Sequence, residues 1–333
     1  MYDFLVTTNL DRIPAERQIV MVDGTVPGWK RVPGSDDIHF DHHRSGGPEI
    51  QLEDLIGFRG VIKNNAIFVT TQVDADACVA AAYLISIANE GVIESETLRK
   101  LRAIAYDCDH LAVPDELSDL ADFAAQAVAA MKSNSNELVG ILGLPTDRKS
   151  WSVEQKEAFA SEAFKEGVDQ IVKAVAWGCP FPGENGEAKA YWENVEKLTR
   201  QIIDEDRIRI HRGCAIFDGT DINEYVDPRC WLKALKQLDI NPKHPITVTK
   251  RDVVVKGEYK GVSYTLGTIP LHSHQKDWDY TKTIFADLTE AELAVGNESK
   301  WGGRATVGGS GWNQPSVLLP TEIISACLLR KPY

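Results

Sequence analysis

The stretch DDIHFDHHRSGG, residues 36–47, holds three of the chain's eight histidines, His39, His42 and His43, among several aspartates. A cluster of polar side chains is costly to bury unless other groups occupy its lone pairs. A divalent metal ion is one such group, because carboxylates and imidazoles are common metal ligands. A hydrated surface loop is the alternative. The stretch therefore raises the question of a metal site.

Further aspartates lie in three other segments of the first third of the chain. Asp23 ends the run RQIVMVDG, Asp74 and Asp76 follow NNAIFVTTQ, and Asp107 and Asp109 lie in IAYDCDHL. We place all of these acids at the ends of buried strands, and the carboxyl ends of parallel strands share one edge of a sheet. Each Asp alone is explained equally well as a helix N-cap or a turn residue. Together they favour convergence around Mn²⁺, Mg²⁺ or Fe.

The elements that would position these acids alternate between strand and helix, which indicates a parallel α/β sheet. Strands are predicted at 2–8, 17–24, 37–43 and 64–72. Helices are predicted at 74–91, which ends with a glycine, and at 95–110, for which Ser95 is the predicted N-cap.

The rest of the chain changes character twice. Helical patterns occupy 115–133, 152–178 and 187–206, and the loop 178–187 is the clearest break between them. Strands are then predicted within 207–219, 246–271 and 282–288, and helices at 289–296 and 320–330. We therefore predict a metal-binding domain with a helical extension at 1–180, a connecting helix at 181–205, and a smaller α+β substrate-binding domain at 206–333.

Composition limits the function further. The 333 residues carry a net charge of −13, which disfavours non-specific polynucleotide binding but not a small phosphorylated substrate held by metal ions. The six cysteines are irregularly spaced and form no C-x-x-C pair, as in a reduced protein without structural zinc. No signal peptide and no apolar run near the ~20 residues of a membrane span is visible. We expect a cytoplasmic protein.

These motifs together resemble the DHH phosphoesterase superfamily, which includes family-II inorganic pyrophosphatases, exopolyphosphatases, single-strand exonucleases and oligonucleotide phosphodiesterases. FDHHR is similar to its signature triplet, VDADACVAAAYL to its D-x-D-A motif, VMVDG to its lone Asp, and AIAYDCDHL to its last metal-binding Asp. The family order is D-x-D, lone Asp, DHH. Here the lone Asp and DHH come first, so the resemblance implies a circularly permuted domain of DHH type.

The glycine-rich segment KWGGRATVGGSGW, residues 300–312, is similar to the GG-H-x-x-A-x-G substrate loop of the DHH-associated domain. Glycines let backbone N–H groups approach an anion, and an arginine offers a two-pronged contact to phosphate. Flanking Trp301 and Trp312 could stack a base. A hairpin tip with a solvent arginine explains the segment alone equally well. The predicted substrate-binding residues are Arg304, Gly302, Gly303, Gly308 and Gly309.

The resemblance implies one or two bound ions, Mn²⁺ or Mg²⁺, and a catalytic pair of Asp41 and His43. In this pair His43 would contact the phosphate or act as general acid. The family usually has a histidine two or four residues before D-x-D, where Gln72 and Thr70 stand here. The implied metal ligands are Asp23, Asp41, His42, Asp74, Asp76 and either Asp107 or Asp109.

The expected function is metal-dependent hydrolysis of a small phosphodiester or phosphoanhydride, such as a short oligonucleotide, a dinucleotide or a pyrophosphate-like compound. The alternative is a non-catalytic nucleotide or phosphate sensor of the same fold, which Gln72 and Thr70 favour. A metal-free α/β protein that binds a sugar or another small molecule is a third option. The expected partner is a small phosphorylated substrate, with no duplex nucleic acid and no membrane. A homodimer is compatible with the sequence.

Overall fold

The computed structural model describes residues 2–41, 58, 60–133, 135–181, 187–222, 224–255, 257–310 and 314–330. The chain divides into two compact units, Met1–Trp192 and Glu193–Tyr333. The first unit is built on a parallel sheet and the second on a mixed sheet with helices, so the predicted α/β class is confirmed. The domain boundaries drawn from the sequence stay a prediction.

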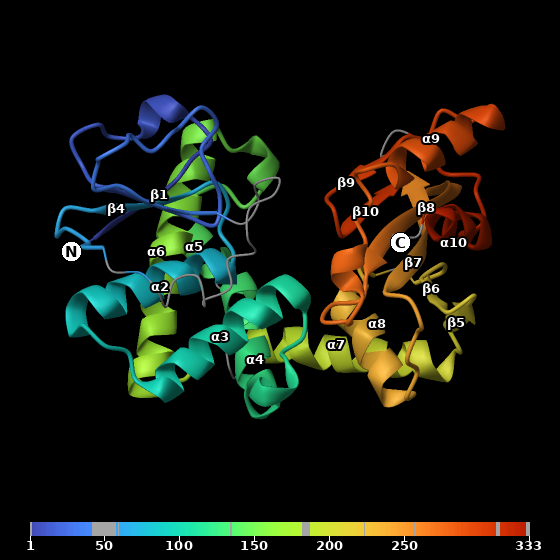
Figure 1. The fold of residues 1–333 in the computed structure, drawn as a ribbon, viewed down its shortest axis with the longest axis horizontal. Coiled ribbons are helices and arrows are strands. Elements are labelled where there is room, and N and C mark those ends of the chain that lie inside the picture. The colour runs from blue at the N-terminus through green and yellow to red at the C-terminus, as the bar shows by residue number, and fades with distance from the viewer. Residues whose placement is uncertain are drawn as a thin grey trace. The chain divides into compact units, whose positions relative to one another are not determined.

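Among the described residues, the sheet of the first unit contains four parallel strands in the order β1-β4-β2-β3. Two of these strands, β1 and β4, are labelled in Figure 1. Both inner strands are buried at every position, as expected for a parallel sheet covered on its two faces. Each strand falls within a range predicted from the sequence. The strands are β1 (Asp3–Val6), β2 (Ile19–Val22), β3 (Ile38–Phe40) and β4 (Ile67–Thr70).

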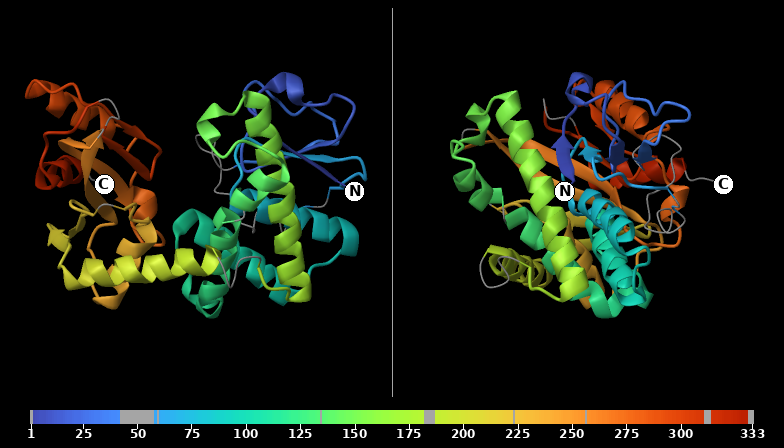
Figure 2. Two further views of the ribbon diagram at one scale, coloured as in Figure 1. Left: turned by 180° about the vertical axis from the view of Figure 1, so that it is seen from behind. Right: turned by 90° about the vertical axis from the view of Figure 1, so that its left-hand side faces the viewer.

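Helices cover one face of this sheet and form the main core with it. The longest helix, α6 (Val153–Trp177), packs against β1 and α2 (Figure 2). On the other face, the loop after β2 contributes Val26 and Trp29 to a smaller apolar cluster. The other helices that begin in this unit are α2 (Ala75–Glu90), α3 (Ser95–His110), α4 (Ala121–Ser133), α5 (Ser135–Ile141), α7 (Glu187–Asp204), η1 (Leu10–Arg12), η2 (Asp115–Leu120) and η3 (Arg148–Ser150).

The start of α2 is determined by Asp74, whose side chain accepts a hydrogen bond from the backbone N–H of Ala77 at 3.0 Å. The helix ends at Gly91 in the left-handed region, as predicted. The predicted cap of the next helix was wrong. Ser95 is the first residue of α3, and the cap position belongs to Glu94, whose side chain makes no capping hydrogen bond.

In the part of the second unit that the structure describes, six strands lie in the order β5-β6-β7-β8-β10-β9, antiparallel except for the β6–β7 pair. Its apolar core includes residues of the sheet and of α9 and α10. The elements are β5 (Ile208–His211), β6 (Cys214–Asp218), α8 (Pro228–Gln237), β7 (Ile246–Val255), β8 (Glu258–Thr268), η4 (Gln275–Asp277), α9 (Ile284–Ala294), β9 (Trp301–Gly303), β10 (Val307–Ser310) and α10 (Pro320–Leu329).

One predicted strand of this unit was wrong. Residues 284–288 of the predicted strand 282–288 form the first turns of α9. Ile284, Phe285 and Leu288 are buried on one side of that helix, a spacing that fits a helix better than a strand. Among the described residues, no helix has both the length and the apolar character required to cross a membrane.

Candidate functional site

Three of the predicted acids lie at the carboxyl edge of the parallel sheet. Asp23 directly follows β2, Asp41 directly follows β3, and Asp74 lies between β4 and α2. Because the strands are parallel and adjacent, their carboxyl ends face the same edge. The expected placement of these three acids at one edge is therefore confirmed.

The backbone turns sharply at Asp23. Its φ of 48° lies in the left-handed region, which Asp tolerates better than most residues, and Gly24 follows with a φ of 153°. The N–H of Asp23 donates to the carbonyl of Phe40 on β3 at 2.9 Å. A Cβ added to Gly24 would collide with the hydroxyl of Thr71. Close contact between the β2 and β4 ends thus sets the position of Asp23.

Four carboxylates interact at this edge: Asp23 and Asp76 are buried, Asp74 is half-buried and Asp109 is exposed. The pKa of Asp74 is raised to about 7, chiefly by burial and then by the charges of Asp23 and Asp109. The pKa of Asp76 is raised well above its usual value by burial and then by the charges of Asp109, Asp23 and Asp74. Asp23 and Asp76 are 3% and 2% exposed. Side chains far apart in the sequence therefore act on one another.

The predicted strand-end position of Asp107 and Asp109 was wrong, since both lie in the last turn of α3. The helix ends at Leu111, whose N–H donates to the carbonyl of Asp107 at 2.9 Å. Asp109 nevertheless reaches Asp74 and Asp76 electrostatically, and Asp107 is buried. The end of the helix predicted at 95–110 thus adds carboxylates to those at the strand ends.

Thr25 and His39 belong to this edge but were not among the predicted site residues. The hydroxyl of Thr25 donates to Asp41 Oδ2 and lies 2.8 Å from His39 Nε2. Their signal in the sequence was weak: Thr25 is two residues after Asp23, and His39 is part of the histidine-rich stretch. The predicted residues His42 and His43 lie outside the described residues.

Two thiols flank the acids. Burial raises the pKa of Cys78 and of Cys108, and the charge of Asp74 raises both further. Such thiols stay protonated near neutral pH, so oxygen atoms dominate the donors available at this edge. Within the described part of the chain, no three His, Cys, Asp or Glu side chains are already arranged as metal ligands.

The glycine-rich segment of the second unit forms a hairpin of the edge strand β9 and its neighbour β10. Gly303 pairs with Gly308, and Gly302 pairs with Gly309. Arg304 is exposed at the turn, and its backbone N–H donates across the hairpin at 2.7 Å. The substrate-binding role of these five residues stays a prediction.

A buried glutamate fixes the start of this hairpin. Glu292 on α9 is 0% exposed and accepts hydrogen bonds from the Trp301 indole at 3.3 Å, from the Asn297 amide at 2.6 Å and from the Ser316 hydroxyl. The Trp301 ring also stacks on Tyr264, with 6.2 Å between centroids. Trp312, the other predicted stacking residue, is outside the described residues.

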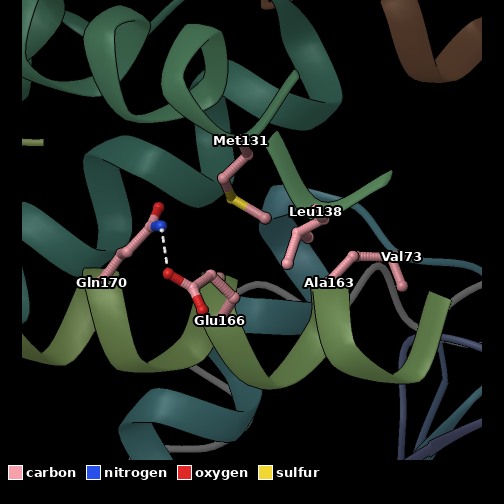
Figure 3. A pocket seen from close by; sticks show the side chains of 7 residues that line it. Val73, Met131, Leu138, Ala163, Glu166 and Gln170 are labelled. Carbon is pink, nitrogen blue, oxygen red and sulfur yellow. Dashed lines mark hydrogen bonds between the residues drawn. The ribbon is translucent and has the colours of Figure 1, made fainter. Parts of the chain in front are cut away.

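A small pocket, partly open to solvent, lies next to the loop that precedes Asp74 (Figure 3). Its two polar side chains bond to each other, Gln170 Nε2 donating to Glu166 Oε1 at 3.2 Å. The rest of the lining is apolar, so we assign no part of the metal site to it. The lining residues are Val73, Met131, Leu138, Ala163, Glu166, Gly167 and Gln170.

No protein-family model and no curated protein sequence matches the chain. Among solved structures, it is similar to the pGpG-specific phosphodiesterase PggH from Vibrio cholerae, at 11% identity and a TM-score of 0.42, over 94% of this chain and 98% of that one. It is also similar to the DHH domain of a protein from a family of ribosomal proteins, at 12% identity and a TM-score of 0.36, over 77% of this chain and 54% of that one.

A third similar structure is RecJ from Thermus thermophilus in complex with Mg²⁺, at 11% identity and a TM-score of 0.29, over 77% of this chain and 38% of that one. Because these identities and TM-scores are low, we base the functional proposal on the side chains at the sheet edge.

Proposed function

We propose that this protein is a divalent-metal-dependent phosphoesterase that hydrolyses a small phosphodiester or phosphoanhydride. The observation that carries the proposal is the group of interacting carboxylates at the carboxyl edge of the sheet, where Asp23 and Asp76 are buried and the charge of Asp109 acts on Asp74 and Asp76. Ligands bind at this edge in open α/β sheets. A divalent ion held there would activate a water molecule and neutralise charge on a phosphoryl group.

The donor chemistry fits a hard cation. Aspartate oxygens suit Mn²⁺ or Mg²⁺, and one or two ions would balance the four carboxylates. Asp41 and Asp107 would add oxygen donors, and His42 an imidazole. The thiols of Cys78 and Cys108 would stay outside the ligand set because burial keeps them protonated.

His43 and Arg304 would act on the substrate, and Asp41 would act with His43 while also binding the ion. Asp41 and His43 form the proposed catalytic pair, with His43 contacting the phosphate or donating a proton to the leaving group. Arg304 would hold a substrate phosphate with its guanidinium group. The proposed partner is one small phosphorylated compound, and neither duplex nucleic acid nor a membrane is part of the proposal.

A phosphate or nucleotide sensor without catalysis is the second candidate, and Thr70 is the observation that favours it. Thr70 stands where the resembled family often has a histidine. Its side chain is fully buried and donates to the carbonyl of Gln72 at 3.0 Å. A hydroxyl used in this way adds no ligand of imidazole type.

Metal analysis of the purified chain, followed by calorimetry with Mn²⁺ and a panel of small phosphodiesters and phosphoanhydrides, tests the proposal. We expect Mn²⁺ binding and Mn²⁺-dependent hydrolysis, both lost in Asp76→Asn. The exposed Asp115→Asn is the matched control. If nucleotides raise the melting temperature but none is hydrolysed, the sensor replaces the enzyme. Unchanged Mn²⁺ affinity in Asp76→Asn would contradict both metal-dependent catalysis and the site itself.

A further inference from the structure

Three side chains at the ends of β2 and β3 form a hydrogen-bonded chain that runs from Asp41 through Thr25 to His39. The Thr25 hydroxyl donates to Asp41 Oδ2, and the same hydroxyl oxygen lies 2.8 Å from His39 Nε2. All three side chains are partly buried. The chain joins the loop after β2 to the last residues of β3, so it depends on the pairing of these two strands.

The protons of these three hydrogen-bonded side chains can have only one arrangement while Asp41 is ionised. A carboxylate only accepts hydrogen bonds, so the single proton of the Thr25 hydroxyl points to Asp41. The hydroxyl oxygen must then accept the second bond, and His39 Nε2 must donate it. Neutral His39 is therefore the Nε2–H tautomer. That nitrogen is engaged with Thr25 and is not the donor to a metal ion.

The surrounding strands hold His39 in place for this bond. His39 is paired with Met21 in the β2–β3 register, and its ring meets Trp29 edge-on with 5.0 Å between centroids and 85° between planes. Trp29 belongs to the small apolar cluster on the same face of the sheet. The imidazole thus has a fixed plane, and the direction in which it donates is fixed with it.

We propose that Thr25 and His39 are positioning residues that fix the orientation of the Asp41 carboxylate toward the proposed metal ion. Partners that orient a ligand in this way change metal affinity by about 10–100-fold when removed. The inference rests on the proposed function, since it takes Asp41 as a ligand. It also divides the three histidines at 39, 42 and 43 by role, because His39 orients a ligand rather than binding the ion through Nε2.

Calorimetry with Mn²⁺ on the full chain is the first test. Thr25→Val removes both hydrogen bonds at nearly constant shape, and His39→Phe removes the donor but keeps the ring against Trp29. We expect each variant to weaken Mn²⁺ binding about tenfold, and the double variant to weaken it no more than either single one. Thr25→Ser should restore most of the affinity.

The matched control is Ser35→Ala, which removes a hydroxyl-to-carboxylate bond of 2.9 Å to Asp37. This bond lies just before β3, at the opposite end of the strand from Asp41. Ser35→Ala should leave Mn²⁺ affinity unchanged. Wild-type affinity in Thr25→Val, alongside a loss in Asp41→Asn, overturns the positioning role and leaves the metal site intact. Unchanged affinity in Asp41→Asn overturns the proposed ligand, and the positioning role with it.

A second test needs no metal. Long-range proton–nitrogen NMR spectra of the metal-free chain report which ring nitrogen of a neutral histidine carries the proton, and His39→Phe assigns the signal. We expect the Nε2–H tautomer for His39 in the wild type and in Thr25→Ser, and a mixture of tautomers in Thr25→Val. A predominant Nδ1–H tautomer in the wild type would overturn the hydrogen-bond chain whatever the enzyme does.

Discussion

At the scale of single residues, repulsion between carboxylates opposes folding at the acidic edge, that is, the carboxyl edge of the parallel sheet with Asp23, Asp74, Asp76 and Asp109. The charges of Asp23 and Asp109 raise the pKa of Asp74 and of Asp76, because ionising these carboxyl groups is costly beside other negative charges and away from water. A group of this kind destabilises the metal-free fold at neutral pH. A bound divalent cation offsets the repulsion, so function and stability make opposite demands on these side chains.

Asp74→Asn should therefore stabilise the metal-free protein in a pH-dependent way. Folding raises the pKa of Asp74 from 3.8 to about 7, so its proton stabilises the fold fully below 3.8 and this contribution is lost as the pH rises through about 7. Asparagine is never charged and still caps α2. In chelator, the variant's melting temperature should match the wild type near pH 4 and exceed it increasingly up to about pH 7.

With saturating Mn²⁺ at about pH 8, the wild type should have a higher melting temperature than Asp74→Asn, because only the wild type has the full set of carboxylates. Asp115→Asn, at an exposed position of η2, is the control and should show no such trend. A melting temperature of Asp74→Asn below that of the wild type at pH 8 in chelator would mean that the carboxylates do not repel one another as the structure indicates.

Site residues that follow from a local sequence pattern could be predicted from the sequence. Site residues whose role depends on strand pairing could not. Asp23 and Asp74 follow buried strands rich in β-branched residues, and this local pattern can be recognised without knowing the neighbouring strands. The roles of Thr25 and His39 depend on the β2–β3 register, because their bond joins residues that only strand pairing brings together. Sequence spacing alone does not encode that register.

At the scale of elements, the turn after β2 controls the site. Gly24→Ala should lower the free energy of unfolding by more than the ~1–3 kcal/mol of a strained backbone, because the added Cβ also meets Thr71. Gly34→Ala is the matched control, with a φ of 82° and nothing within 4 Å of the added Cβ. Chemical denaturation measures both. The pair Gly24→Ala with Thr71→Ala should recover part of the loss, and no recovery would show that the clash is not the cause.

The hairpin that carries Arg304 depends on α9 through one carboxylate. Glu292→Gln should lower the free energy of unfolding by about 2–4 kcal/mol, because the new amide presents N–H groups to buried donors that need an acceptor. These donors include the Trp301 indole and the Asn297 amide. Glu290→Gln, exposed on the same helix, is the control for denaturant titration. Equal effects of the two substitutions would show that the buried bonds contribute little.

The first turns of α9 were missed, whereas the part that contains Glu292 was predicted as a helix. The segment 282–288 is apolar at its centre and short, so a strand and a helix fit it almost equally well. The helix continues because Glu292, a charged residue expected on a surface, is buried with donors from the segments after α9, among them Ser316 and the Val317 N–H at 3.2 Å. Contacts of this kind are tertiary and leave no local pattern.

At the scale of the whole molecule, the net charge limits which substrates the proposed phosphoesterase could hydrolyse. A net charge of −13 repels polyanions, and each phosphate added to a substrate increases the repulsion unless a cation meets it. The proposed ions and Arg304 offer cationic contacts to only a few phosphates. The acidic edge therefore suits a compact substrate, and the rest of the surface disfavours a long one.

We therefore expect the rate of Mn²⁺-dependent hydrolysis to fall from a dinucleotide to a pentanucleotide to a long single strand, and to vanish for a duplex.

The dependence of these rates on salt concentration is the control. A typical nucleic-acid-binding protein loses affinity as salt rises, because it binds by releasing counterions. Here salt screens the repulsion between the protein and a long polyanion. Raising the salt concentration from about 50 to about 200 mM should therefore reduce the difference in hydrolysis rate between long and short substrates. Initial rates at fixed free Mn²⁺ measure this ratio. A long strand that is cleaved fastest at low salt, and more slowly as salt rises, would show that a cationic track outweighs the net charge, and the substrate would then be a polymer.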